Sequence, residues 1–144
     1  MLTVSGELRQ WHKVTVDLLG PITSEAATPN PFSDYRFVAV FSHVGAPEVR
    51  FRVPGYYAAD GNAGETSAVA GRVFRAHLSP PHTGGWTVTV EFTEGVDVAV
   101  AGGGTPVSGL HGASASFDVL ASDKSNATRD FRAKGMLLPV AGER

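Results

Sequence analysis

Hydrophobic and polar residues alternate with a period of two in several short segments of this chain. The clearest segment is 86–92, where Trp, Val, Val and Phe alternate with Thr, Thr and Glu. Residues 49–53 and 74–78 alternate in the same way, whereas residues 35–41 are apolar at nearly every position. A period of two is typical of a strand with one buried face, and the continuous apolar run predicts a central strand covered on both sides.

Turn-forming residues separate these segments, because Gly-Pro, Asn-Pro and Pro-Pro pairs and a run of three glycines fall between them. Residues 62–70 carry no apolar stripe of helical period, so we expect a long loop there with at most one helical turn. The predicted strands span residues 14–18, 35–41, 49–53, 74–78, 86–92, 96–100, 116–120 and 135–140. This pattern predicts an all-β fold, an immunoglobulin-like antiparallel β-sandwich of about eight strands, with a jelly roll as the alternative. The predicted core consists of Phe37, Phe41, Phe51, Val53, Phe74, Leu78, Trp86, Val88, Val90 and Phe117.

Composition narrows the class of protein. Of 144 residues, 42% are hydrophobic and 18% charged, so a single domain over residues 1–144 can bury a core without a metal or a disulfide. The lack of cysteine excludes thiolate metal sites and cysteine nucleophiles. A net charge of -2 with scattered basic residues predicts no nucleic-acid partner. We also predict no membrane partner and no export signal, because no apolar run has the required length and residues 1–10 lack the signal pattern.

Catalytic and metal-binding patterns are weak in this sequence. The 5 histidines lie apart, without the HExxH or HxH spacing that places two imidazoles on one metal ion. No GxSxG motif accompanies the serines, and no pair among the 14 acidic residues is singled out for glycoside hydrolysis. We therefore predict no catalytic residue, no metal site and no cofactor for this domain.

The segment 54–65 carries the strongest binding candidate. Tyr56 and Tyr57 are neighbours in extended backbone, so one should enter the core and the other should lie at the surface. Asp60, Asn62 and Glu65 could hold a hard cation, but an Asx-type turn is the favoured interpretation. An exposed ring beside polar groups can stack on a sugar, although a tyrosine that only caps the sandwich edge is the favoured alternative. The candidate ligand- or interface-binding residues are Tyr56, Tyr57, Asp60, Asn62, Glu65 and Trp11.

Several motifs follow one another in a specific order. They are Asn-Pro-Phe at 30–32, Pro-Gly-Tyr-Tyr at 54–57 and Gly-Gly-Trp at 84–86, between Trp-His-Lys-Val-Thr-Val-Asp at 11–17 and Asp-Phe-Arg-Ala-Lys-Gly at 130–135. In this combination, residues 10–135 resemble an immunoglobulin-like domain of unknown function. In bacterial glycoside-hydrolase-like proteins, of the apiosidase-like and collagen-binding kind, that domain is N-terminal and precedes a TIM-barrel domain.

The resemblance implies an accessory role, because the reaction of such proteins is assigned to the barrel, and no catalytic residue is carried over. It also implies a longer parent chain, whose catalytic TIM-barrel domain is the partner, and a secreted or periplasmic location. Our first hypothesis is a non-catalytic module that packs on or extends the catalytic domain of a glycoside hydrolase. The alternatives are a stand-alone carbohydrate-binding module, with polysaccharide as its partner, and an adhesion or protein-interaction domain.

Overall fold

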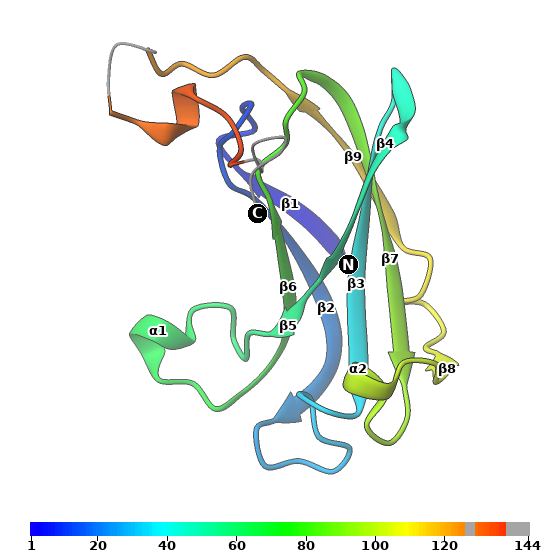
Figure 1. Ribbon diagram of the computed structural model, residues 1–144. Coiled ribbons are helices and arrows are strands. Elements are labelled where there is room, and N and C mark those ends of the chain that lie inside the picture. Colours follow the sequence, from blue (N-terminus) through cyan, green and yellow to red (C-terminus); the bar gives the residue numbers. More distant parts are fainter. Residues whose placement is uncertain (126–128, 138–144) are drawn as a thin grey trace, which may run out of the picture.

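Two antiparallel sheets pack face to face and form a β-sandwich (Figure 1). The computed structural model describes residues 1–125 and 129–137. The first sheet has the order β1 (Leu2–Gly6), β2 (Val14–Ser24), β6 (Ala70–Leu78) and β5 (Tyr56–Tyr57). The second has the order β4 (Ala46–Pro54), β3 (Tyr35–His43), β7 (Gly84–Glu94) and β8 (Thr105–Pro106), and β9 (Ser114–Val119) also pairs with β7. The short helices are α1 (Ala63–Thr66), α2 (Val98–Ala101) and η1 (Phe131–Ala133), and none of the described helices has the length and hydropathy needed to cross a bilayer.

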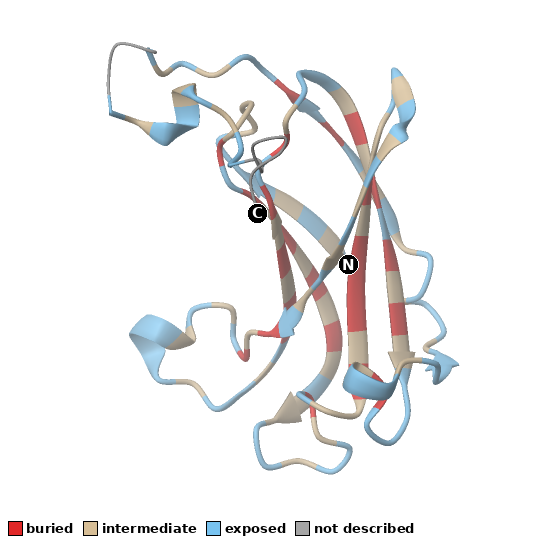
Figure 2. Cartoon of the chain, in the orientation of Figure 1, coloured by how far each residue is buried: buried red, intermediate tan, exposed pale blue. Residues whose placement is uncertain are grey.

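The core lies between the sheets, where the apolar faces of the strands meet (Figure 2). Alternate residues of β2 and β7 are buried, as the period of two predicts. Phe74 of the first sheet meets Phe92 of the second edge to face, with ring centroids 4.9 Å apart. Full burial of such a side chain contributes about 1.5–3 kcal/mol. The predicted β-sandwich is confirmed, while its finer assignment as immunoglobulin-like stays a prediction.

Some sequence-based expectations are wrong in detail. Phe51 and Val53 are only half-buried, because β4 is an edge strand. Residues 96–100 form a turn and α2 instead of a strand, because Asp97 takes a left-handed φ of 54°. Of the three valines in this segment, only Val98 is buried. Residues 135–137 form no strand, and 138–140 lie outside the described residues.

Three strands escaped prediction, and one predicted strand is covered less than expected. Strands β5 and β8 have two residues each, too few for a periodic signal, and β1 offers only two apolar positions. Strand β3 is central, as predicted, and α2 packs against it. Its outer face is covered at Val38, which is buried, and only in part at Val40, which is half-buried.

The chain passes from one sheet to the other at Gly55. Strand β4 ends at Pro54 on the edge of the second sheet, and β5 begins at Tyr56 on the edge of the first. The amide of Gly55 donates to the carbonyl of Phe37 at 2.8 Å, which holds the crossover against β3. The backbone lies so close to the Phe37 ring that a side chain at position 55 has no room. This crossover sets where the two tyrosines point.

We expect Gly55→Ala to lower the free energy of unfolding by about 1–3 kcal/mol, the range for an overpacked core site. Its added Cβ would lie 2.1 Å from Cδ1 of Phe37 and 2.7 Å from the carbonyl oxygen of Arg75. Gly64→Ala in α1 is the matched control, because nothing lies within 4 Å of its added Cβ and alanine favours a helix. Urea unfolding followed by tryptophan fluorescence measures both. A wild-type midpoint for Gly55→Ala would contradict the tight crossover.

Candidate functional site

Strand β5 places its two tyrosines on opposite faces of the first sheet, as the sequence predicts. Tyr57 points into the sandwich and is 6% exposed, and its hydroxyl donates to the carbonyls of Thr23 at 3.0 Å and Gly71 at 3.3 Å. Burial raises the pKa of this phenol, so it remains protonated and a donor. Tyr56 points outward and is 49% exposed. Tyr56 is therefore the ring that a ligand can reach, while Tyr57 is part of the core.

The Tyr56 ring is held in place by a chain of hydrogen bonds. Its hydroxyl lies 3.0 Å from Nε2 of His77, and Nδ1 of His77 lies 3.0 Å from the hydroxyl of Thr15. The rings of Tyr56 and His77 are also in contact, with centroids 5.9 Å apart. Since both hydroxyls can donate or accept, a neutral imidazole satisfies both bonds with its one donor and one acceptor nitrogen.

A second polar contact stabilises the same region. The Arg75 guanidinium forms a bidentate ion pair with Asp17, with Nε to Oδ1 at 2.7 Å and Nη2 to Oδ2 at 2.8 Å. Its Nη1 donates to the carbonyl of Gly61 at 2.9 Å, which ties the loop after β5 to the sheet. The hydrogen bonds to Asp17 raise the pKa of Arg75, so the cation is always present. The guanidinium thus holds the loop against the sheet, and the ion pair with Asp17 fixes the Arg75 side chain beside Tyr56.

Strand register collects these polar side chains on one surface. Tyr56 pairs with Arg75, Arg75 with Asp17, and Asp17 with Thr3, so one row crosses all four strands of the first sheet. The next row holds His77, Thr15 and Ser5. All are half-buried or exposed. The polar face, as we name it, consists of Thr3, Ser5, Thr15, Asp17, Tyr56, Arg75 and His77.

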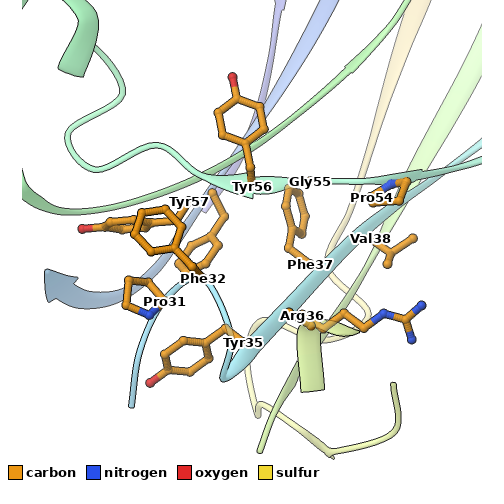
Figure 3. Close-up of a pocket in the computed structure, with 12 residues that line it drawn as sticks. Pro31, Phe32, Tyr35, Arg36, Phe37, Val38, Pro54, Gly55, Tyr56 and Tyr57 are labelled. Atoms are coloured by element: carbon orange, nitrogen blue, oxygen red, sulfur yellow. The ribbon is translucent and has the colours of Figure 1, made fainter. Parts of the chain in front are cut away.

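Two cavities flank the crossover. One of about 200 Å³ lies beneath it, and Phe32, Tyr35, Phe37 and Tyr57 are among the residues that line it, whereas the Tyr56 ring points away (Figure 3). The other, of about 340 Å³, lies between β5 and the loop that follows. Phe32 borders both cavities, is 53% exposed and stands edge to face on Tyr57 with centroids 5.6 Å apart. An aromatic groove therefore adjoins the polar face at its β5 edge.

The loop after β5 is a closed turn at Asp60. One carboxylate oxygen accepts from the amide of Asn62 at 2.8 Å, and the other accepts from the hydroxyl of Thr66 at 2.7 Å. These bonds, the Thr66 bond foremost, lower the pKa of Asp60. Asn62 and Glu65 are exposed, and no three metal-ligating side chains cluster in the part of the chain that the structure describes. This geometry is the favoured Asx-type turn.

Trp11 lies apart from the other candidates. Its amide donates to the carbonyl of Pro80, beyond the end of β6, and its ring packs beside Gly135. The structure brings Tyr56 and Asn62 to one cavity, but it does not bring Trp11 to them. Binding by the predicted site residues stays a prediction.

A separate polar cluster surrounds His12, whose side chain is 1% exposed. Its Nδ1 contacts the Glu7 carboxylate, and its Nε2 lies 3.4 Å from Oδ1 of Asp123 and from the hydroxyl of Ser122. The serine hydroxyl, the imidazole and the Glu7 carboxylate contact one another in the order of a catalytic triad. However, the Ser122 hydroxyl donates to the carbonyl of Arg132 at 2.8 Å, and burial closes the imidazole to a substrate. We interpret this His12 cluster as a clamp between the N-terminal segment and the later residues Ser122, Asp123 and Arg132.

Sequence analysis found Tyr56 but missed the residues that hold it. Arg75 and His77 are the outward positions of one alternating strand, and Asp17 and Thr15 those of another. Alternation predicts only that such side chains face solvent. Their meeting with Tyr56 depends on pairing between strands far apart in the sequence, for which the sequence carries no local signal.

Comparison with known proteins gives a family and a fold. Residues 7–93 match the family model described as a domain of unknown function (DUF5060). The fold is similar to that of a "putative glycoside hydrolase" from Bacteroides vulgatus ATCC 8482, with a TM-score of 0.54 and 17% sequence identity. The match covers 82% of this chain but only 17% of that one, and at this identity it shows a shared fold alone. No curated protein matches the chain.

We expect the pKa of His77 to lie below the ordinary value of about 6.5, because burial, Lys13 and Arg75 disfavour the cation more than Asp17 favours it. The stability that the neutral imidazole contributes is then fully present above pH about 6.5 and is lost as the pH falls through the folded-state pKa. An NMR titration of the imidazole protons measures the pKa. The difference in Tm between wild type and His77→Gln should be smaller at acidic pH than at neutral pH. An unchanged difference would contradict the lowered pKa of His77.

Proposed function

Because the chain belongs to the family described as a domain of unknown function (DUF5060), and its fold recurs within a much longer protein, we propose that it is a non-catalytic accessory module of a glycoside hydrolase. The observation that carries this proposal is the asymmetry of coverage, 82% of this chain against 17% of the other. A module of that relative size leaves most of its parent chain for the reaction. The proposed partner is a catalytic TIM-barrel domain in the same parent chain, on which the module packs or whose cleft it extends, in a secreted or periplasmic protein.

The state of the carboxyl groups supports a role without catalysis. A glycosidase needs a general acid whose pKa is raised, so that it is protonated at working pH. Hydrogen bonds from the backbone amides of Asn30 and Asp97 lower the pKa of Asp34. Two hydrogen bonds from the Arg52 guanidinium lower the pKa of Glu91. The pKa is likewise lowered at Glu7, Asp60, Asp123 and Asp130.

We expect the purified 144-residue protein to release no product from a panel of aryl glycosides and polysaccharides between pH 4 and 8. Chromogenic release and reducing-sugar assays measure this, with a buffer blank and a heat-denatured sample as controls. Turnover that follows the protein through two purification steps and is lost when one carboxylate is replaced by its amide would overturn the proposal.

The half-exposed Tyr56 ring on a polar sheet face favours a second candidate function, binding of polysaccharide by the module itself. An aromatic ring offers an apolar face to the C–H groups of a sugar, and neighbouring polar side chains reach its hydroxyls. This function differs from the first in requiring no catalytic domain, because the isolated chain would bind its ligand.

A further inference from the structure

We propose that the polar face binds a neutral polysaccharide chain that runs across the strands of the first sheet, with the Tyr56 ring as its stacking platform. The inference rests on the second candidate function and names its site and its ligand class. Four observations carry it: a fixed ring, a row of hydrogen-bonding groups, balanced charge and an adjoining cavity.

The Tyr56 ring is preorganised for stacking. Its hydroxyl is held by His77, which is held in turn by Thr15, so the ring occupies its orientation before a ligand arrives. Ordering a mobile side chain on binding would cost free energy, and a fixed one avoids that cost. At 49% exposure the ring still presents a free surface. A fixed, half-exposed ring is suited to lie against a sugar.

The polar groups beside the Tyr56 ring can form hydrogen bonds with sugar hydroxyls. Arg75, Asp17 and Thr3 follow Tyr56 in one row across the sheet. With strands about 4.8 Å apart, four strands span about 14 Å, room for a short stretch of an oligosaccharide. Carboxylate and hydroxyl oxygens in this row accept hydrogen bonds, and hydroxyl and guanidinium groups donate them. The row therefore offers both kinds of partner that a sugar hydroxyl requires.

The balance of charge favours a neutral ligand. The Asp17 carboxylate and the Arg75 guanidinium compensate each other through two hydrogen bonds. Burial and neighbouring cations keep the pKa of His77 low, so its imidazole is uncharged at neutral pH. Exposed charges of opposite sign border the face, Lys13 near His77 and Glu25 in the lining of the adjoining cavity. An acidic polysaccharide would find too little positive charge to offset the loss of its hydration.

A cavity of about 340 Å³ extends the face at its β5 edge. Tyr56 and Arg75 belong to both the polar face and the lining of this cavity, together with Phe32 and Asn62. A chain stacked on Tyr56 can thus place its next sugar unit in the cavity. Phe32 supplies a second, 53% exposed aromatic surface there.

Native affinity electrophoresis tests the inference with gels that contain mixed-linkage β-glucan, arabinoxylan, galactomannan or the acidic polymer polygalacturonate. We expect retardation in at least one neutral gel, and a loss of affinity of roughly tenfold or more in Tyr56→Ala, as for removal of a stacking ring. Phe131→Ala is the matched control, since this ring is 74% exposed but lies in η1, away from β5 (Figure 1). It should bind as wild type does.

Three results would overturn the inference: no retardation in any neutral gel, retardation that Tyr56→Ala leaves unchanged, or retardation by polygalacturonate alone. Circular dichroism checks that Tyr56→Ala is folded. If it is not, NMR shift mapping of the unmodified chain with β-glucan oligosaccharides replaces it, and we expect Thr15, Asp17 and His77 to shift most. Shifts confined to other residues would also overturn the inference. None of these results affects the accessory-module proposal, which the turnover assay tests separately.

Discussion

The close approach of Gly55 to the Phe37 ring is the constraint on which the site depends. The chain has to leave the second sheet and join the first within one residue, and only a residue without a side chain fits between the ring and the neighbouring strand. Because β5 begins directly after this point, the crossover decides which tyrosine enters the core. Tyr57 closes the sandwich beneath it, and Tyr56 is turned outward to the polar face. The core and the candidate site thus share one structural origin.

Polar contacts on the outer face of the first sheet orient side chains, which the apolar core cannot do. The core fixes the distance between the sheets, but it does not orient side chains on the outside. There the Asp17–Arg75 ion pair and the contacts of His77 with Tyr56 and Thr15 fix the side chains across three strands. Such partly exposed contacts add little to stability. Their main consequence is geometric, since they hold a ring and its neighbours in one arrangement that a ligand can meet.

The His12 cluster shows how similar residue types serve structure instead. Its imidazole is surrounded by two carboxylates and a hydroxyl, and it is closed to solvent. Arg132 also approaches Glu7, at 3.9 Å, so the cluster joins segments from both ends of the chain. A buried polar group needs partners, and here one of them, Glu7, is local, whereas Ser122 and Asp123 lie more than a hundred positions away in the sequence. The same residue types on the polar face keep access to solvent, and that access separates a candidate site from a clamp.

The sequence by itself determined the fold class, most strands, the burial of Trp86 and Phe74, and the opposite directions of Tyr56 and Tyr57. Each follows from a local rule, the two-residue period of an extended chain. It also indicated a turn at Asp60, because the donors to an Asx turn lie within a few residues. It misplaced a strand at 96–100, where three valines at alternate positions imitate the pattern but Asp97 breaks the extended backbone. Only the tertiary structure decided that Tyr56 meets His77, that Arg75 meets Asp17 and that Trp11 lies apart from them, because strand register depends on contacts between distant segments that no local pattern encodes.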